Sequence, residues 1–183
     1  MNHLYLSGFM GAGKTTVGRL LAQKLSLEWI DLDHWIESRQ KMKISDIFQN
    51  GGESRFRDLE TQELRAVALR HTSVVSLGGG AILRSENRSL IQQSGHLIYL
   101  RAQFSTLLDR LIQQMDSRPL LAGLRVEELG HQVERKFSER RHLYEMANYT
   151  IDTDTERKED VSPAAVVDQI IKLVGGGRGL IEF

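Results

Sequence analysis

Residues 8–15 read Gly8-Phe9-Met10-Gly11-Ala12-Gly13-Lys14-Thr15, which matches the pattern G-x-x-x-x-G-K-[ST] in full. Glycines in such a loop let successive backbone N–H groups converge on phosphate oxygens. The Lys14 ammonium can reach the outer phosphates, and the Thr15 hydroxyl can bind Mg²⁺. The same letters would also fit a glycine-rich turn with a chance Lys-Thr pair. The surrounding sequence decides between these two interpretations.

The flanking residues place the loop between a strand and a helix. His3–Ser7 is a short run typical of a strand, and after the loop Val17, Leu20, Leu21 and Leu25 recur at helical spacing. A helix N-terminus attracts phosphate because its unpaired N–H groups and its dipole face the anion. We therefore predict that ATP and Mg²⁺ bind here, with the phosphates held by Gly11, Ala12, Gly13, Lys14, Thr15 and Thr16.

Short apolar runs alternate with helical patterns along the rest of the chain. The expected strands are Glu28–Leu32, Ser73–Leu77, His96–Arg101 and Tyr149–Asp152. The expected helices are Glu53–Arg70, Ser85–Ser94, Ser105–Met115, Val126–Met146 and one opened by Ser162 as N-cap with Pro163 at the first helical position. In the polar stretch 36–49 we expect a cap at Ser45. Such alternation is typical of a parallel sheet covered on both faces.

These elements predict an α/β fold, a three-layer α/β/α P-loop kinase domain with a central parallel sheet over residues 1–174. Within it we expect a small inserted helical region over 34–60, which would bind substrate, and a lid over 116–124. Both segments are polar, and loops of this kind commonly carry function. The glycine-rich residues 175–183 are expected to form a flexible tail.

Composition narrows the class of protein. The 183 residues include 24 basic and 24 acidic side chains, a balance that does not suggest a nucleic-acid partner. Without cysteine, no disulfide or thiolate zinc site can form, and the six histidines show no metal spacing. No apolar run is long enough to span a bilayer, and no secretory signal precedes the first strand. We expect a cytoplasmic monomer that binds small molecules and no membrane.

Besides the Thr15 hydroxyl, a magnesium site of this kind usually has a carboxylate, and the strand before the triple glycine does not supply one. That strand, Val74-Val75-Ser76-Leu77-Gly78, has no terminal aspartate. Asp31 and Asp33 follow another predicted strand, whose alternation would point both to one face. One carboxylate could reach Mg²⁺ and the other could accept a proton from a hydroxyl. Taken alone, the pair is equally consistent with two solvated turn aspartates.

Several further motifs make the sequence resemble the shikimate kinases over nearly its whole length. They are the phosphate loop, Asp31-Leu32-Asp33, Ile44–Phe48, the F-R-x-x-E arrangement of Phe56-Arg57 and Glu60, Ser76-Leu77-Gly78-Gly79-Gly80-Ala81, Arg118-Pro119-Leu120-Leu121, and Glu139-Arg140 followed by Leu143-Tyr144. Their order and spacing together are specific. Where many members have proline after the Glu-Arg pair, this chain has His142.

The resemblance implies ATP-dependent phosphorylation of the 3-hydroxyl of shikimate. It implies that Asp33, Arg57, Gly78, Gly79, Gly80 and Arg140 bind shikimate, the two arginines through its carboxylate. It implies a catalytic role for Lys14, Asp33 and Arg118, with Arg118 in the lid. Thr15 and Asp31 match the magnesium positions, and Arg110 and Pro163 resemble adenine-side elements.

Other interpretations remain open at this point. Another small-metabolite kinase of the same fold, such as a gluconate kinase, also acts on a hydroxylated carboxylate. A catalytically silent regulatory relative is a further alternative, although the intact Lys14, Asp33 and Arg118 argue against it. Arg57 and Glu60 could be an exposed helical ion pair. Packing is the favoured role for the aromatic residues Trp29, Trp35 and Phe56.

Overall fold

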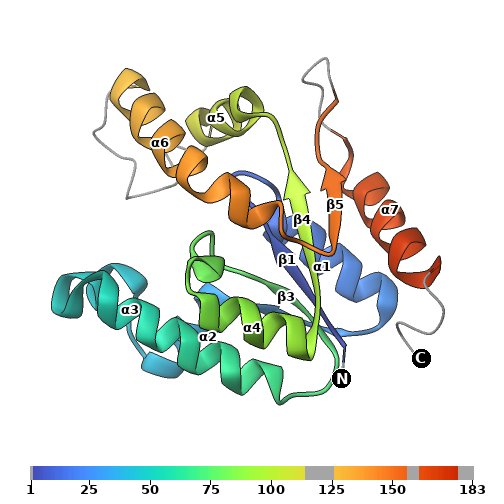
Figure 1. Cartoon of the computed structure of the whole chain (residues 1–183), viewed down its shortest axis with the longest axis horizontal. Coiled ribbons are helices and arrows are strands. Elements are labelled where there is room, and N and C mark those ends of the chain that lie inside the picture. The colour runs from blue at the N-terminus through green and yellow to red at the C-terminus, as the bar shows by residue number, and fades with distance from the viewer. Residues whose placement is uncertain (1, 114–125, 156–160, 177–183) are drawn as a thin grey trace.

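The computed structural model describes residues 2–113, 126–155 and 161–176, which form a parallel sheet with helices on both faces (Figure 1). The sheet has five strands in the order β2-β3-β1-β4-β5. The strands are β1 His3–Ser7, β2 Glu28–Asp31, β3 Ser73–Ser76, β4 Gly95–Arg101 and β5 Tyr149–Asp152. In the centre, Leu6 of β1 lies opposite Ser76 of β3 and Ile98 of β4. The parallel pairing brings the carboxyl ends of all strands to one edge.

The helices are α1 Lys14–Leu25, α2 Leu32–Gln40, α3 Ile44–Ala68, α4 Ser85–Ser94, α5 Phe104–Gln113, α6 Val126–Tyr144 and α7 Pro163–Gly176, with a 3₁₀ turn, η1, at Ala81–Leu83. Helices α1 and α7 pack together on one face of the sheet, and α3 and α4 cover the other (Figure 1). Helices α5 and α6 lie at the carboxyl edge. This arrangement confirms the predicted three-layer α/β/α fold.

Buried apolar side chains of the central strands form the core between the sheet and the helices. Leu4, Leu6, Val75 and Ile98 are fully buried. A sheet covered on both faces needs such runs because each face must be apolar. Truncating one of these side chains to alanine would cost about 2–5 kcal/mol. The core therefore fixes the strand ends on which the site is built.

The second strand ends one residue earlier than predicted. Asp31 is the last residue of β2, and its Oδ1 accepts a hydrogen bond of 3.3 Å from the His34 N–H. This N-cap starts α2 at Leu32. The alternation argument for Asp31 and Asp33 was therefore wrong, because Asp33 lies in the first turn of a helix.

The inserted region consists of α2 and α3. Helix α3 is interrupted at Gly52, whose φ of 70° and ψ of −177° suit glycine. The predicted cap at Ser45 was wrong, because α3 begins at Ile44, whose N–H donates to Glu37 Oε1 at 3.0 Å. The helix expected over Glu53–Arg70 is the second half of α3 and ends at Ala68.

The last helix begins as predicted. Ser162 Oγ accepts a 3.2 Å hydrogen bond from the Ala165 N–H, and Pro163 is the first helical residue. The helix continues through Gly175 and Gly176, so the tail predicted to begin at Gly175 starts too early, because two glycines at a helix end do not by themselves break it. The rest of the predicted tail lies outside the described residues. Within those residues, no helix combines the length and apolar character that crossing a bilayer requires.

Candidate active site

The phosphate loop has the strand–loop–helix geometry that its sequence predicts. Gly11 and Gly13 adopt φ of 84° and 89°, a region that a side chain would strain. The loop leaves β1 and runs directly into the first turn of α1. Lys14 Nζ donates to the carbonyl oxygens of Gly8 at 2.8 Å and Phe9 at 3.0 Å. The ammonium therefore lies over the loop, where the helix N-terminus also favours negative charge.

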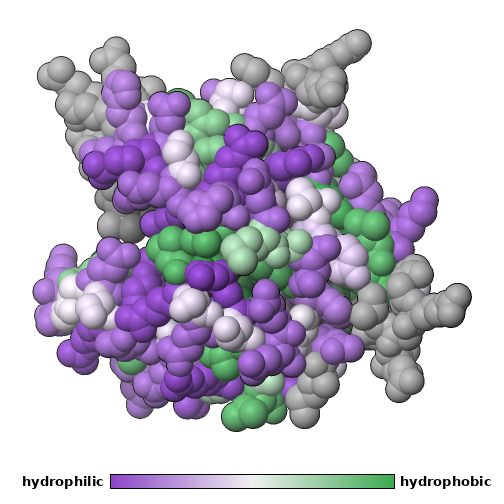
Figure 2. Space-filling view, viewed as in Figure 1, coloured by the Kyte–Doolittle hydropathy of each residue, from purple (hydrophilic) through white to green (hydrophobic). Residues whose placement is uncertain are grey.

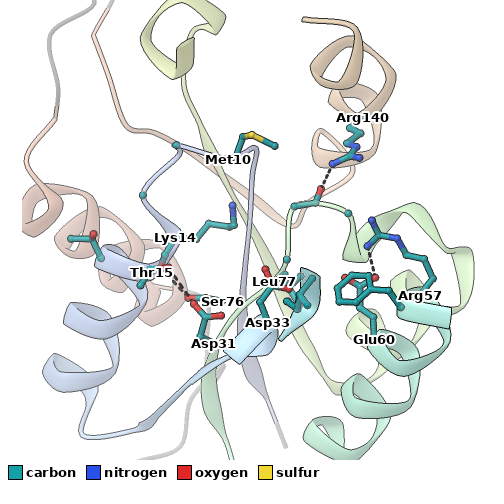
Figure 3. Close-up of a pocket in the computed structure, with 18 of the residues that line it drawn as sticks. Met10, Lys14, Thr15, Asp31, Asp33, Arg57, Glu60, Ser76, Leu77 and Arg140 are labelled. Atoms are coloured by element: carbon teal, nitrogen blue, oxygen red, sulfur yellow. Dashed lines mark hydrogen bonds and ion pairs between the residues drawn. The ribbon is translucent and has the colours of Figure 1, made fainter. Parts of the chain in front are cut away.

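A cavity of about 670 Å³ opens beside this loop at the carboxyl edge of the sheet (Figure 3). Twelve of the predicted site residues line it: Gly11, Gly13, Lys14, Thr15, Thr16, Asp31, Asp33, Arg57, Gly78, Gly79, Gly80 and Arg140. They come from the phosphate loop, the start of α1, the end of β2, α2, α3, α6 and the segment after β3. Open α/β sheets bind ligands at this edge.

Two oxygen ligands for a cation lie side by side in the cavity. Thr15 Oγ1 donates to Asp31 Oδ2 at 3.2 Å (Figure 3). A hydroxyl and a carboxylate suit Mg²⁺, which usually keeps several waters and takes phosphate oxygens from its nucleotide. Among the described residues, no cluster of three or more His, Cys, Asp or Glu side chains could hold a metal by itself. The residues present therefore fit a magnesium ion that arrives with a nucleotide.

Asp33 presents a half-buried carboxylate to the cavity. Burial raises the pKa of Asp33, and the nearby Asp31 raises it further, whereas Lys14 and Arg57 act in the opposite direction. A Cβ on Gly78 would lie only 2.5 Å from Asp33 Oδ1. A side chain at position 78 would therefore force the Asp33 carboxylate to move. A carboxylate with a raised pKa is a better proton acceptor.

Glu60, which is not among the predicted site residues, holds Arg57 in place. Arg57 Nη1 donates to Glu60 Oε2 at 2.8 Å, and Arg57 Nη2 donates to Glu53 Oε1 at 3.2 Å. The side chain of Glu60 is fully buried, and its Oε1 has no hydrogen-bond partner among the described residues. Burial raises the pKa of Glu60, and Arg57 opposes that shift. The pair is therefore not an exposed helical ion pair, which was the alternative that the sequence left open for Arg57 and Glu60.

Arg57 and Arg140 approach residues 78–80, here called the glycine segment, from two different helices. A Cβ on Gly80 would lie 2.5 Å from Arg57 Nη2, and Arg140 Nη1 donates to the Gly79 carbonyl at 3.3 Å. Figure 3 shows both guanidinium groups beside this segment, Arg57 from α3 and Arg140 from α6. Residues far apart in sequence thus present two planar cations to one side of the cavity.

The adenine-side candidates do not line the cavity. Arg110 Nη1 donates to Gly11 O at 3.0 Å, and its Nη2 donates to Thr153 O at 2.8 Å, so Arg110 joins the phosphate loop to the segment after β5. Pro163 is exposed at the start of α7, and Ala12 is buried beneath the loop. Arg118 and the predicted lid over 116–124 lie outside the described residues.

Sequence reasoning missed an apolar wall and a hydroxyl. Met10, Ile44, Phe48 and Phe56 line the cavity, and the rings of Phe48 and Phe56 lie 4.9 Å apart. Phe56 was expected to serve packing, and it does pack, but it also faces the cavity. The sequence contains one indication of this wall. The apolar residues of the segment 44–60 are few and scattered, so they do not form a continuous apolar helix face.

The hydroxyl belongs to Ser76, at the end of β3, where the sequence lacks a carboxylate. Ser76 Oγ donates to the Lys14 carbonyl at 3.0 Å and accepts from Trp29 Nε1 at 3.1 Å. It therefore ties the start of α1 to the sheet. Trp35 Nε1 donates to Glu63 at 3.0 Å. Trp29 and Trp35 thus serve packing, as predicted, and neither lines the cavity.

Comparisons with known proteins agree with these features. The family model described as shikimate kinase matches residues 10–174. A shikimate kinase of a Sulfurihydrogenibium species is 38% identical over 171 residues, which cover 93% of this chain and 96% of that protein. Shikimate kinase 2 of Photorhabdus laumondii is 45% identical over 151 residues, covering 81% and 84% of the two chains.

Solved structures of shikimate kinases have the same fold as this chain. Shikimate kinase from Bacteroides thetaiotaomicron superposes with a TM-score of 0.86 at 30% identity, covering 95% of this chain and 98% of that one. Shikimate kinase from Acinetobacter baumannii in complex with shikimate gives a TM-score of 0.84 at 35% identity, covering 97% and 95%.

Proposed function

This chain belongs to the shikimate kinase family and is an ATP-dependent kinase, and we propose from that premise that it transfers the γ-phosphoryl group of ATP to the 3-hydroxyl of shikimate. The products are shikimate 3-phosphate and ADP, on the route to chorismate and the aromatic amino acids. One observation carries the proposal. A single cavity contains the phosphate loop, the half-buried carboxylate of Asp33, and the two guanidinium groups of Arg57 and Arg140.

On the nucleotide side, the phosphate loop binds ATP. Lys14 exchanges its bonds with Gly8 and Phe9 for the outer phosphates, which is a short movement for a flexible side chain. Thr15 and Asp31 hold Mg²⁺, which neutralises charge on the phosphates when bound. Arg110 and Pro163 lie on the adenine side, and Arg118 of the predicted lid binds phosphate.

On the acceptor side, the two arginines bind the shikimate carboxylate and Asp33 binds the reacting hydroxyl. Planar guanidinium groups match a carboxylate through two parallel hydrogen bonds. The backbone of Gly78, Gly79 and Gly80 forms the adjoining surface. The apolar wall around Phe56 covers the ring of the substrate.

The chemistry is in-line transfer through a loose transition state, in which the protein mainly supplies positioning and charge. Asp33 orients the acceptor hydroxyl and takes its proton as the new P–O bond forms. Its raised pKa suits that role, because a weakly basic carboxylate would hold the proton poorly. The lysine and arginine groups stabilise the charge on the transferred group.

We further propose that the chain acts as a cytoplasmic monomer. Figure 2 shows mostly hydrophilic residues over one face, with a band of hydrophobic residues between α6 and α4. The described large hydrophobic side chains that are exposed come from several separate elements, for example Leu20 of α1, Leu69 after α3 and Leu173 of α7. Light scattering of the purified protein tests the oligomeric state.

The test of the activity is a coupled ADP-release assay with ATP, Mg²⁺ and a panel of hydroxy acids that includes shikimate and gluconate. We expect turnover with shikimate and little with the others. Preferential turnover of gluconate would instead assign a different metabolite kinase of this fold. Binding of ATP without turnover of any acceptor would indicate a silent relative.

A further inference from the structure

One backbone carbonyl at the edge of the cavity accepts two hydrogen bonds from α6. The Tyr144 hydroxyl donates to Gly79 O at 2.5 Å, and Arg140 Nη1 donates to the same oxygen at 3.3 Å. The two side chains are one helical turn apart, so they project from the same face of α6. Tyr144 thus contacts the segment that lies between the two carboxylate-binding arginines.

The bond to Gly79 determines where the next N–H group points. The chain has no cis peptide in its described residues, and in a trans peptide the C=O and N–H groups point in opposite directions. With the Gly79 carbonyl held towards α6, the Gly80 N–H points away from that helix. This N–H donates to no acceptor among the described residues, and Gly80 lines the cavity.

Tyr144 is itself held firmly. Its ring stacks on that of Tyr99 with centroids 5.3 Å apart and an interplanar angle of 17°, and the residue is 1% exposed. Burial raises the pKa of Tyr144 to about 12. The hydroxyl is therefore a neutral donor throughout the physiological pH range. A guanidinium carries five N–H donors, so Arg140 can share the carbonyl with Tyr144 and still bind a carboxylate.

We propose that Tyr144 is a positioning residue for the acceptor, which fixes the peptide between Gly79 and Gly80 so that the Gly80 N–H is presented to shikimate. Because Tyr144 and Arg140 share the Gly79 carbonyl, the Tyr144 hydrogen bond also fixes the position of Arg140 relative to the glycine segment. Tyr144 does not touch the reacting atoms. The inference rests on the proposed function, because it assigns an orienting role within the same site.

The variant that tests this is Tyr144→Phe, which removes only the hydroxyl and retains the ring that stacks on Tyr99. We expect the KM for shikimate to rise roughly three- to tenfold, the range that one neutral hydrogen bond gives. The KM for ATP should change by less than about twofold, because the hydrogen bond and the ring contact of Tyr144 are to Gly79 and Tyr99, which lie outside the phosphate loop.

Tyr5→Phe is the matched control. Tyr5 is fully buried, its hydroxyl forms a 2.8 Å hydrogen bond with Ser94, and it does not line the cavity. Both variants should lose a similar amount of thermal stability, and only Tyr144→Phe should change the KM for shikimate. That split separates positioning from general loosening of the fold.

Three results would overturn the inference while leaving the proposed function intact. They are an unchanged shikimate KM in Tyr144→Phe, an equal rise in the KM for both substrates, and the same rise in Tyr5→Phe. A wild-type protein that does not phosphorylate shikimate would overturn the proposed function, and the inference would fall with it.

Discussion

Thr15 Oγ1 donates a hydrogen bond of 3.2 Å to Asp31 Oδ2. This contact joins the first turn of α1 to the end of β2 at the carboxyl edge of the sheet. It aligns a hydroxyl and a carboxylate oxygen beside the phosphate loop.

Replacing Asp31 by asparagine should therefore weaken the use of Mg²⁺. The amide preserves the shape and an acceptor for the Thr15 hydroxyl, but it removes the negative charge that attracts the cation. We expect the Mg²⁺ concentration for half-maximal activity to rise several-fold at fixed ATP. An unchanged magnesium dependence would show that Asp31 is not a metal ligand.

Replacing Asp33 by asparagine should lower turnover by about 10²-fold or more, the scale for loss of a general base. The affinity for ATP should change little, because Asp33 faces the acceptor. Asp58→Asn is the control: Asp58 is exposed on α3 and pairs with Arg84 outside the cavity. If Asp33→Asn kept normal turnover but used magnesium poorly, the roles of Asp31 and Asp33 would be exchanged.

Replacing Lys14 by alanine should abolish phosphoryl transfer and leave the fold intact, because its ammonium donates to the Gly8 and Phe9 carbonyl oxygens at the loop and is only half-buried. Circular dichroism and a single-turnover assay measure the two effects. Lys24→Ala, at the exposed end of the same helix where Lys24 pairs with Asp168, should behave as wild type. Near-normal turnover in Lys14→Ala would refute the assignment of the phosphate loop.

The two arginines should determine the preference for a carboxylate. Losing one charge-assisted contact of about 1.5–3 kcal/mol should weaken the affinity for shikimate by about ten- to a hundredfold. The measurement compares shikimate with an analogue that lacks the carboxylate, in Arg140→Ala and in Arg57→Lys. Lysine is chosen at position 57 because an uncharged residue would leave the buried Glu60 unpaired, at about 3–5 kcal/mol.

Wild type should discriminate strongly between the two compounds, and the variants much less, since lysine keeps the charge but loses the planar fork. Arg65→Ala is the control, because Arg65 lies on the same helix as Arg57 and pairs with Glu86 at the surface. Full discrimination in both cavity variants would remove the main physical reason for choosing shikimate over another alcohol.

Acid should destabilise the fold through His3. This residue is fully buried at the start of β1, and neither ring nitrogen makes a hydrogen bond among the described residues. Burial lowers the pKa of His3 from its usual 6.5, so below that pH the unfolded chain binds more protons than the folded chain. Stability rises with pH wherever this holds, and it is therefore lost as the pH falls below about 6.5.

His3→Leu should reduce this loss by up to about 1.4 kcal/mol per pH unit. Urea unfolding at about pH 7.5 and about pH 5.5 measures it, with the exposed His131→Ala as control. Equal pH dependence in wild type and His3→Leu would contradict the prediction.

Elements with a clear hydrophobic periodicity, or with a recognisable capping residue, could be predicted from the sequence. The strand His3–Ser7, the helix Ser85–Ser94 and the Ser162-Pro163 start all lie where their patterns placed them. The end of β2 could not be predicted, because whether Asp31 continues a strand or caps a helix depends on the hydrogen bond to His34 and on its contact with Thr15.

The site was predictable where a motif fixes the backbone and not where it depends on packing. The conformation of the phosphate loop can be predicted from the glycines in its own sequence. The burial of Glu60 depends on how α3 packs, and the hydrogen bond from Tyr144 to Gly79 joins residues that lie 65 positions apart in the sequence. Periodicity carries no information about such distant pairs.

The tight approach of Asp33 to Gly78 has a consequence for how this enzyme can evolve. Any other residue at position 78 would place its Cβ 2.5 Å from Asp33 Oδ1, and at position 80 the same distance from Arg57 Nη2. A side chain at position 78 would have to displace the Asp33 carboxylate, and one at position 80 the Arg57 guanidinium, the two groups that we propose bind the acceptor. We therefore expect adaptation to a bulkier acceptor to begin at the apolar residues Ile44 and Phe48, which also line the cavity, and the glycines at positions 78 and 80 to be retained.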